Sequence, residues 1–209
     1  MLHYNAMKTL FFAIFTCFVM AGTAIAAPKA VPVALDTVRT TYDDGSVSRV
    51  YTVKKGTDVR EGMALSYHPN GKLAVEAPYK NGKLEGVLRA FNENGTLRET
   101  VGYKDGEEEG FSIHYYENGK KKSRESYRRG ILTGMSEDWD ENGKLRRQIP
   151  YENGQIHGVV KIFNELGQIE EEMKFVRGLR NGIYRRYSFG KIMLEAEFKE
   201  NRCVKNCNF

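Results

Sequence analysis

The sequence predicts an all-β protein: an elongated, twisted antiparallel sheet of about six consecutive β-hairpin repeats, each of 24 residues. Three observations predict this fold. Aromatic residues recur every 24 positions, glycines keep the same period, and apolar residues alternate with polar ones between the glycines. Glycine is also in excess, with 21 of 209 residues, against a usual share of ~7%. Because there are only 5 prolines, collagen and proline-rich linkers are excluded.

The aromatic residues form two interleaved series with the same period. The first aromatic series consists of Tyr79, Tyr103, Tyr127, Tyr151, Phe175 and, one residue early, Phe198. The second aromatic series consists of Tyr67, Phe91, Tyr115, Trp139, Phe163 and Tyr187. A repeat of this length is one supersecondary unit that buries its apolar side chains against its neighbours. We therefore interpret both series as the core of the sheet.

Asn-Gly pairs separate the predicted strands. They stand at 70–71, 81–82, 94–95, 118–119, 142–143 and 153–154. Both residue types tolerate positive φ, which primed hairpin turns require. Between two turns, Leu73, Val75, Ala77 and Tyr79 alternate with other residues, as in a half-buried strand. Six hairpins are predicted over 55–202, preceded by a half unit around Tyr42, which makes about thirteen strands.

The chain divides into four segments: a signal peptide at 1–26, an N-terminal lead-in at 27–41, the repeat sheet at 42–202 and a C-terminal cap at 203–209. Lys8, the apolar run that follows it and the Ala24-Ile25-Ala26 sequence are typical of a cleaved secretory signal. A transmembrane anchor is the alternative, but the apolar run is shorter than the ~20 residues of a span. We therefore expect an exported protein, periplasmic or secreted.

Two of the three cysteines, Cys203 and Cys207, lie outside the predicted signal peptide. In an exported protein we expect them to close a small disulfide loop. A metal site is the alternative, although no histidine lies near them in the sequence. Their spacing excludes a redox C-x-x-C motif.

The third full repeat departs from the pattern. Its inward positions read Lys121, Ser123 and Glu125, where other repeats carry Leu, Val or Ile. Lysines and arginines surround these positions and recur in the next hairpin. This cluster predicts a basic patch that binds an anionic partner. The alternative is an eroded repeat whose face is simply exposed to solvent. The predicted patch consists of Lys120, Lys121, Lys122, Arg124, Arg128, Arg129, Lys144, Arg146 and Arg147.

No motif of a known catalytic chemistry appears. The nucleophile-elbow, zinc-protease and phosphate-loop patterns are absent from the sequence. His68, His114 and His157 occupy three different places in the repeat and are expected at the surface. We therefore expect no enzyme activity, no cofactor and no metal. Export and a mild net charge of +5 also argue against nucleic acid as a partner.

The unit Tyr79-Lys-Asn-Gly82…Gly86…Phe91-Asn-Glu-Asn-Gly95-Thr-Leu97 resembles the MORN repeat in its bacterial variant form, which recurs in proteins labelled YwqK-type antitoxins. The resemblance covers about 160 residues. It implies a twisted sheet of hairpins and links to protein scaffolding, membrane or phospholipid association, or an accessory role in enzymes. It implies no catalytic residues.

These observations predict an exported, non-enzymatic protein-binding or scaffold module of the cell envelope. The alternatives are peripheral association with anionic membrane lipid through the basic patch, and an immunity or antitoxin-type protein. The expected partner is a protein. Open edge strands and an exposed aromatic ladder are also consistent with a homodimer.

Overall fold

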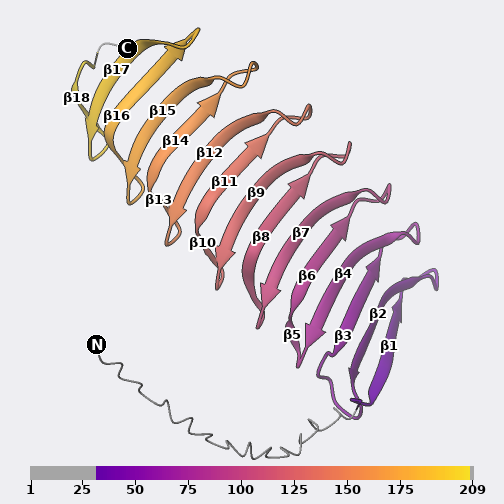
Figure 1. Cartoon of the computed structure of the whole chain (residues 1–209). Helices are drawn as coiled ribbons and strands as arrows, with labels where there is room; N and C mark the ends of the chain where they lie inside the picture. Colours follow the sequence, from indigo (N-terminus) through magenta and orange to yellow (C-terminus); the bar gives the residue numbers. More distant parts are fainter. Residues whose placement is uncertain (1–31, 208–209) are drawn as a thin grey trace, which may run out of the picture. The chain divides into compact units, whose positions relative to one another are not determined.

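The structure is a computed structural model that describes residues 32–207, and these form a single antiparallel sheet of 18 strands. Figure 1 shows the hairpins following one another in chain order, from β1 in indigo to β18 in yellow. The strands are β1 (Leu35–Thr41), β2 (Val47–Lys54), β3 (Gly62–Tyr67), β4 (Leu73–Lys80), β5 (Lys83–Leu84), β6 (Gly86–Phe91), β7 (Leu97–Lys104), β8 (Glu107–Tyr115), β9 (Lys121–Arg128), β10 (Ile131–Leu132), β11 (Gly134–Trp139), β12 (Leu145–Glu152), β13 (Gln155–Ile156), β14 (Gly158–Phe163), β15 (Ile169–Val176), β16 (Leu179–Ser188), β17 (Lys191–Lys199) and β18 (Arg202–Lys205).

The fold class predicted from the repeat is confirmed: all strands pair antiparallel, each long strand with its neighbours in the chain. The strand count exceeds thirteen for two reasons. The two-residue strands β5, β10 and β13 are separated from the strands that follow them by one residue each. In addition, β1 and β18 extend the sheet into the segments expected to be lead-in and cap. The predicted signal peptide at 1–26 lies outside the described residues.

The lead-in boundary at residue 41 is wrong, because β1 pairs with β2 over its whole length. The turn between them begins at Tyr42, whose carbonyl accepts the N–H of Gly45 at 2.9 Å. The predicted half unit is therefore the second half of a complete hairpin. Leu35–Thr41 is rich in β-branched residues, which favour strands, but it carries no aromatic residue to mark the repeat.

Two kinds of turn connect the strands, and the sequence prediction distinguished only one. After the first aromatic series, both central residues have positive φ, as at Asn81 (51°) and Gly82 (81°), which defines a type I′ turn. In the Asn-Gly turns after the second series only the glycine does: Gly71 has φ 79° and its N–H bonds the carbonyl of His68, three residues back. The strand register shifts beside this turn, between Ser66 and Tyr67. The Asn-Gly pairs after the second series thus form wider turns with a bulge, and the prediction of primed turns is wrong there.

Every buried side chain lies on one face of the sheet. Because strand residues alternate between faces, Ala77 and Val101 share a face with Tyr79 and Tyr103, two residues further along their strands. We call this face the aromatic face, since the first aromatic series lies on it, and the other the opposite face. The buried residues are Val53, Ala77, Ala90, Val101, Ser112, Ser136, Met173, Ala196 and Phe198.

The aromatic series are only partly the core that the sequence predicts. Nearly all of their rings are half-buried, and Phe198 alone is fully buried, at 7% exposure. The cause is the architecture: the described residues make one sheet with no second layer to cover it. No helix among the described residues has the length and apolarity to cross a membrane.

Hydrogen bonds between successive turns also hold the repeats together. The N–H of Gly82 bonds the carbonyl of Arg60 at 2.8 Å, and the N–H of Gly106 bonds the carbonyl of Leu84 at 2.9 Å. This contact recurs with the repeat period as far as Gly178, whose N–H bonds the carbonyl of Ile156. Each hairpin is thereby fixed to the preceding one at the sheet edge as well as through its strands.

Candidate functional site

The aromatic face has an apolar cavity at its N-terminal end. Here Arg60 lies between two rings, with its guanidinium carbon 4.7 Å from the ring centre of Tyr51 and 5.0 Å from that of Tyr79. Its Nη1 also donates a hydrogen bond to the hydroxyl of Tyr79 at 3.0 Å. The cavity, about 250 Å³, continues over Ala64 and Val75. Cation–π contacts on both sides hold the guanidinium beside an apolar floor.

A second cavity, about 310 Å³, lies at the C-terminal end of the same face. Phe198 and Met173 form its floor, each only 7% exposed. Tyr184 packs edge-on against Phe198, with ring centres 6.4 Å apart and planes at 89°. Arg180 and Arg186 add two cations to the lining. Both ends of the aromatic face therefore combine aromatic rings, apolar side chains and arginine.

The middle of the aromatic face is polar. Ser112 and Ser136 are buried at a position of the repeat that is Leu88, Val160 or Tyr184 elsewhere. Glu125, one of the predicted departures from the repeat, accepts a hydrogen bond from the hydroxyl of Tyr127 at 2.8 Å. Burial and this hydrogen bond raise the pKa of Tyr127 above its ordinary value. The third repeat therefore interrupts the apolar surface, and the two end cavities are separate sites.

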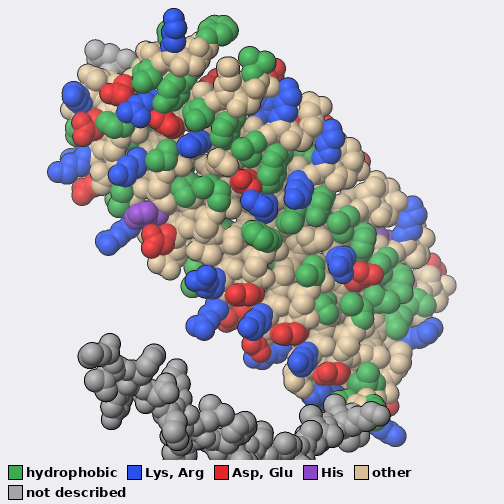
Figure 2. Space-filling view, in the orientation of Figure 1, with side chains coloured by type: hydrophobic (Ala, Val, Ile, Leu, Met, Phe, Trp, Pro, Cys, Tyr) green, Lys and Arg blue, Asp and Glu red, His purple; other side chains and the backbone are tan. Residues whose placement is uncertain are grey.

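The nine residues of the predicted basic patch do not share one surface. Successive residues of β9 point to alternate faces of the sheet. Lys121 therefore lies on the aromatic face, whereas Lys122 and Arg124 do not. Lys122, Arg124, Arg128 and Arg146 belong to the opposite face, and Lys121 and Arg147 to the aromatic face. Lys120, Arg129 and Lys144 lie in turns. Figure 2 shows basic and acidic side chains interspersed over the visible surface.

Two of these lysines bond neighbouring turns. The Nζ of Lys120 donates to the carbonyl of Asn142 at 3.1 Å, and the Nζ of Lys144 donates to the carbonyl of Glu165 at 2.7 Å. Lys72 makes the same contact earlier in the chain, with Asn94 at 3.0 Å. A lysine after the glycine of these turns therefore joins successive hairpins.

Three of the arginines are neutralised by carboxylates. Arg124 pairs with Glu137 at 2.5 Å, and its guanidinium lies 5.1 Å from the ring centre of Phe111. Arg147 pairs with Asp138 at 2.7 Å. Arg146 pairs with the turn residue Asp140 at 3.0 Å. These three ion pairs and the lysine contacts between turns engage much of the positive charge of the predicted patch.

Besides the two turn lysines, four bases of the predicted patch have no ion pair among the described residues: Lys121, Lys122, Arg128 and Arg129. The Nζ of Lys122 lies 5.7 Å from the ring centre of Tyr116. Arg128 and Arg129 line a cavity of about 510 Å³ at the sheet edge, together with Asp105, Glu107 and Glu109. Because this cavity contains both signs of charge, it has no marked preference for an anion.

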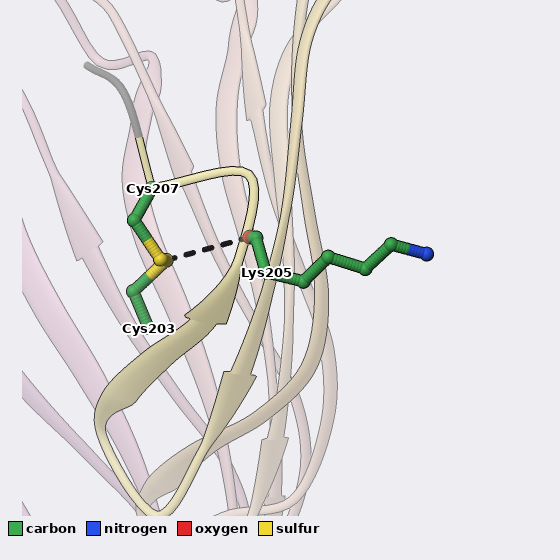
Figure 3. The surroundings of a disulfide bond; sticks show 3 residues. All are labelled: Cys203, Lys205 and Cys207. Atoms are coloured by element: carbon green, nitrogen blue, oxygen red, sulfur yellow. Dashed lines mark hydrogen bonds between the residues drawn. A yellow bond between two sulfur atoms is a disulfide. The ribbon is translucent and has the colours of Figure 1, made fainter.

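The two cysteines outside the predicted signal peptide are joined by a disulfide. Cys203 lies in β18 and Cys207 follows it, so that the bond closes a short loop (Figure 3). The sulfur of Cys203 lies 3.5 Å from the carbonyl oxygen of Lys205. Cys203 also packs against the cluster of Met173, Ala196 and Phe198. The loop therefore fixes the last strand against the floor of the C-terminal cavity.

The histidines lie far apart along the sheet. His68 contacts the carbonyl of Phe91 at 2.9 Å, His114 lies 3.4 Å from Glu99, and His157 lies 3.6 Å from Glu152. Between residues 32 and 207, no group of three or more His, Cys, Asp or Glu is placed to hold a metal ion.

The sequence reasoning missed the two end cavities and their arginines. Arg60 and Arg180 stand five repeats apart at one position of the 24-residue frame, which Leu84, Leu132 and Ile156 occupy elsewhere. The replacement of an apolar residue by arginine was therefore visible in the sequence. What was not visible is that these side chains lie over aromatic rings.

Comparison with known proteins places the repeat in a family. No curated protein matches the chain. The model of the MORN repeat variant matches five successive segments, which together span more than half of the chain: 60–81, 84–105, 108–129, 132–153 and 156–177. Each segment ends at the first central residue of a type I′ turn. The hairpin β16–β17 continues the sheet beyond the last match. The chain therefore belongs to the MORN repeat variant family, whose repeats are commonly protein- or membrane-binding modules.

Proposed function

We propose that this protein is an exported, non-enzymatic protein-binding or scaffold module of the cell envelope, and that its partner docks on the aromatic face. One observation carries the proposal. The aromatic face has half-buried rings and a cavity at each end, and nothing else among residues 32–207 covers it. Apolar surface of this kind in a single-layer sheet is typical of an interaction site.

Two features support export. The apolar run after Lys8 and the Ala24-Ile25-Ala26 sequence are typical of a cleaved signal. The disulfide between Cys203 and Cys207 is of a kind that persists in oxidising compartments.

Photo-crosslinking in intact cells tests the docking face. A photoreactive amino acid at Leu88, on the aromatic face, is compared with one at Arg98, on the opposite face. We expect the Leu88 probe to give a protein adduct that the Arg98 probe does not give. Adducts from Arg98 alone would place the partner on the opposite face and contradict the proposal.

The alternative is peripheral association with anionic membrane lipid. It is favoured by Lys121, Lys122, Arg128 and Arg129, whose charges are not neutralised by ion pairs within the described sheet. Replacement of Lys121, Lys122 and Arg128 by glutamate would abolish binding to phosphatidylglycerol vesicles if these bases hold the protein at a membrane. Unchanged vesicle binding would exclude this version. An immunity or antitoxin role would instead require that the captured partner be a toxin.

A further inference from the structure

One position of the repeat differs between the ends of the sheet and its interior. It is Arg60 in the first complete repeat and Arg180 in the last. In the repeats between, it is Leu84, Glu108, Leu132 and Ile156. A leucine or isoleucine therefore satisfies the packing of the sheet at this position. The arginines at the two ends are not needed for the fold, which points to another role.

Arg180 lies at the rim of the C-terminal cavity. Its guanidinium carbon is 5.6 Å from the ring centre of Phe198, and its side chain is exposed. Its backbone N–H donates to the Oδ1 of Asn201 at 2.8 Å, and its carbonyl accepts the N–H of the same asparagine at 3.0 Å. Two hydrogen bonds thus fix the backbone from which the guanidinium extends.

The two arginines of this cavity differ in whether a carboxylate pairs with them. Arg186 pairs with Glu171 at 3.3 Å, and that pair is half-exposed at the cavity wall. Arg180 has no carboxylate partner among the ion pairs of the described sheet. The cavity therefore offers one guanidinium fork beside an apolar floor, and such a fork matches a carboxylate in two parallel hydrogen bonds.

The volume of the C-terminal cavity limits the size of the apolar group that it can bind. About 310 Å³ corresponds to roughly ten water molecules at ~30 Å³ each, which is enough for a large aliphatic or aromatic side chain. The lining residues Val160, Ile162 and Met173 supply aliphatic contacts, and Phe175 and Tyr184 supply rings. These surfaces favour an apolar group that enters the cavity while a charged neighbour stays at the rim.

We propose that this cavity binds a polypeptide segment of the partner in which a large apolar side chain stands next to an aspartate or glutamate. The apolar side chain fills the cavity, and the carboxylate pairs with Arg180. The inference rests on the proposed function and names the partner chemistry at one part of the aromatic face. A membrane surface fits less well, because it needs several free cations together and Arg180 is the single unpaired one in this cavity.

Panning tests the proposal without a known partner. The oxidised, signal-processed protein is immobilised and panned against a phage-displayed library of random linear peptides. We expect enrichment of sequences that place Phe, Trp, Leu or Met beside Asp or Glu. Binding of a labelled enriched peptide is then measured by fluorescence anisotropy for wild type, Arg180→Gln, Arg180→Lys and Arg177→Gln.

Each variant has its own expected result. Loss of the guanidinium in Arg180→Gln weakens binding by about tenfold or more, as for a charge-assisted pair. Arg180→Lys keeps the charge but not the fork, so it recovers part of the affinity. Arg177→Gln is the matched control, since Arg177 is an exposed turn cation outside the cavity, and it binds as wild type does. Circular dichroism confirms that each variant is folded.

Three outcomes would overturn the inference: enriched peptides without acidic residues, equal binding by wild type and Arg180→Gln, or no enrichment together with Arg180-dependent binding to phosphatidylglycerol vesicles. The last would assign the cavity to lipid. If photo-crosslinking still captures a protein on the aromatic face while panning fails, the proposed function stands and only this partner chemistry is wrong.

Discussion

Glu109 and Arg129 are joined across successive hairpins: the Oε2 of Glu109 accepts a hydrogen bond from the backbone N–H of Arg129 at 3.0 Å. Glu85 makes the same contact one repeat earlier, with the N–H of Asp105 at 2.8 Å, and Glu61 makes it one repeat before that. In each case the carboxylate satisfies the first central N–H of a type I′ turn. The run of glutamates around Glu109 therefore contains a structural residue and is more than a solvated charge cluster.

Removal of this carboxylate should weaken the contact between neighbouring hairpins. We expect Glu85→Ala to lower the free energy of unfolding by about 1 kcal/mol, because the backbone N–H of Asp105 then loses a charge-assisted hydrogen bond. Glu85→Gln keeps an acceptor oxygen and should lose less. Urea unfolding measures both. Glu93→Ala, at an exposed turn position, is the control, and an equal loss there would contradict the assignment.

Arg129 occupies a backbone conformation that suits another residue better. Its φ is 50°, in the left-handed region, at the turn position where Asn81 and Asn153 have φ 51° and 50°. Asparagine tolerates this region and arginine does so less well. We expect Arg129→Asn to raise the free energy of unfolding by about 0.5–1 kcal/mol, measured by urea unfolding. Arg128→Asn, one residue earlier in β9, should bring no such gain.

The repeat period and the strand positions could be predicted because both depend on single residues that recur. The spacing of Tyr103 and Gly106 recurs in five successive copies, so the hairpins follow from the sequence. The difference between turn types could not be predicted in the same way. Asn-Gly stands in both, and only the register shift beside Gly71 shows that its turn is the wider one.

The basic patch illustrates what the sequence leaves open. Lys121 and Lys122 are adjacent in the chain, yet strand alternation places them on different faces. Whether a base is free then depends on cross-strand neighbours: Arg124 and Glu137 are thirteen positions apart but lie opposite each other in β9 and β11. Counting charges along the chain overestimated the charge available to a partner.

Gly102 lies within β7 and not at a turn, and the structure requires it for a different reason from the turn glycines. A Cβ there would lie 2.2 Å from the carbonyl oxygen of Glu109, where the register between β7 and β8 shifts. We expect Gly102→Ala to cost about 2 kcal/mol or more in the free energy of unfolding, since backbone must move. Ser126→Ala, at the equivalent position of β9, should be nearly neutral in the same urea titration.

Glu172 should make the stability of the C-terminal hairpins depend on pH. Its Oε1 accepts hydrogen bonds from the hydroxyl of Tyr187 at 2.7 Å and from Arg185 at 2.9 Å. The bond from Tyr187, and then that from Arg185, hold its pKa below the ordinary value of 4.5. A carboxyl whose pKa is lowered by folding stabilises the native state above its unfolded pKa, and the contribution is lost as pH falls through the lowered value.

We therefore expect the free energy of unfolding to fall between about pH 5 and pH 3, and Glu172→Gln to flatten this dependence. Urea unfolding at a series of pH values measures the slope. Glu170→Gln is the matched control, because Glu170 is an exposed residue on the same strand and face. A slope unchanged by Glu172→Gln would show that other carboxyls cause the acid sensitivity.

Reduction of the disulfide should act locally. The bond between Cys203 and Cys207 closes a loop of only five residues, so chain entropy limits its contribution to about 2 kcal/mol. Its loss frees β18, which pairs with β17 alone. We expect faster hydrogen exchange in β17 and β18 after reduction and unchanged exchange in β7 and β8, because each hairpin contacts only its neighbours.

Cys203→Ser should reproduce the effect of the reductant, whereas uniform loss of protection along the sheet would contradict a local role. The same experiment bears on binding. Cys203 packs against Met173, Ala196 and Phe198, and two of these form the floor of the cavity beside Arg180. If the loop holds this floor in place, reduction will weaken peptide binding at Arg180 while the fold of the remaining hairpins persists.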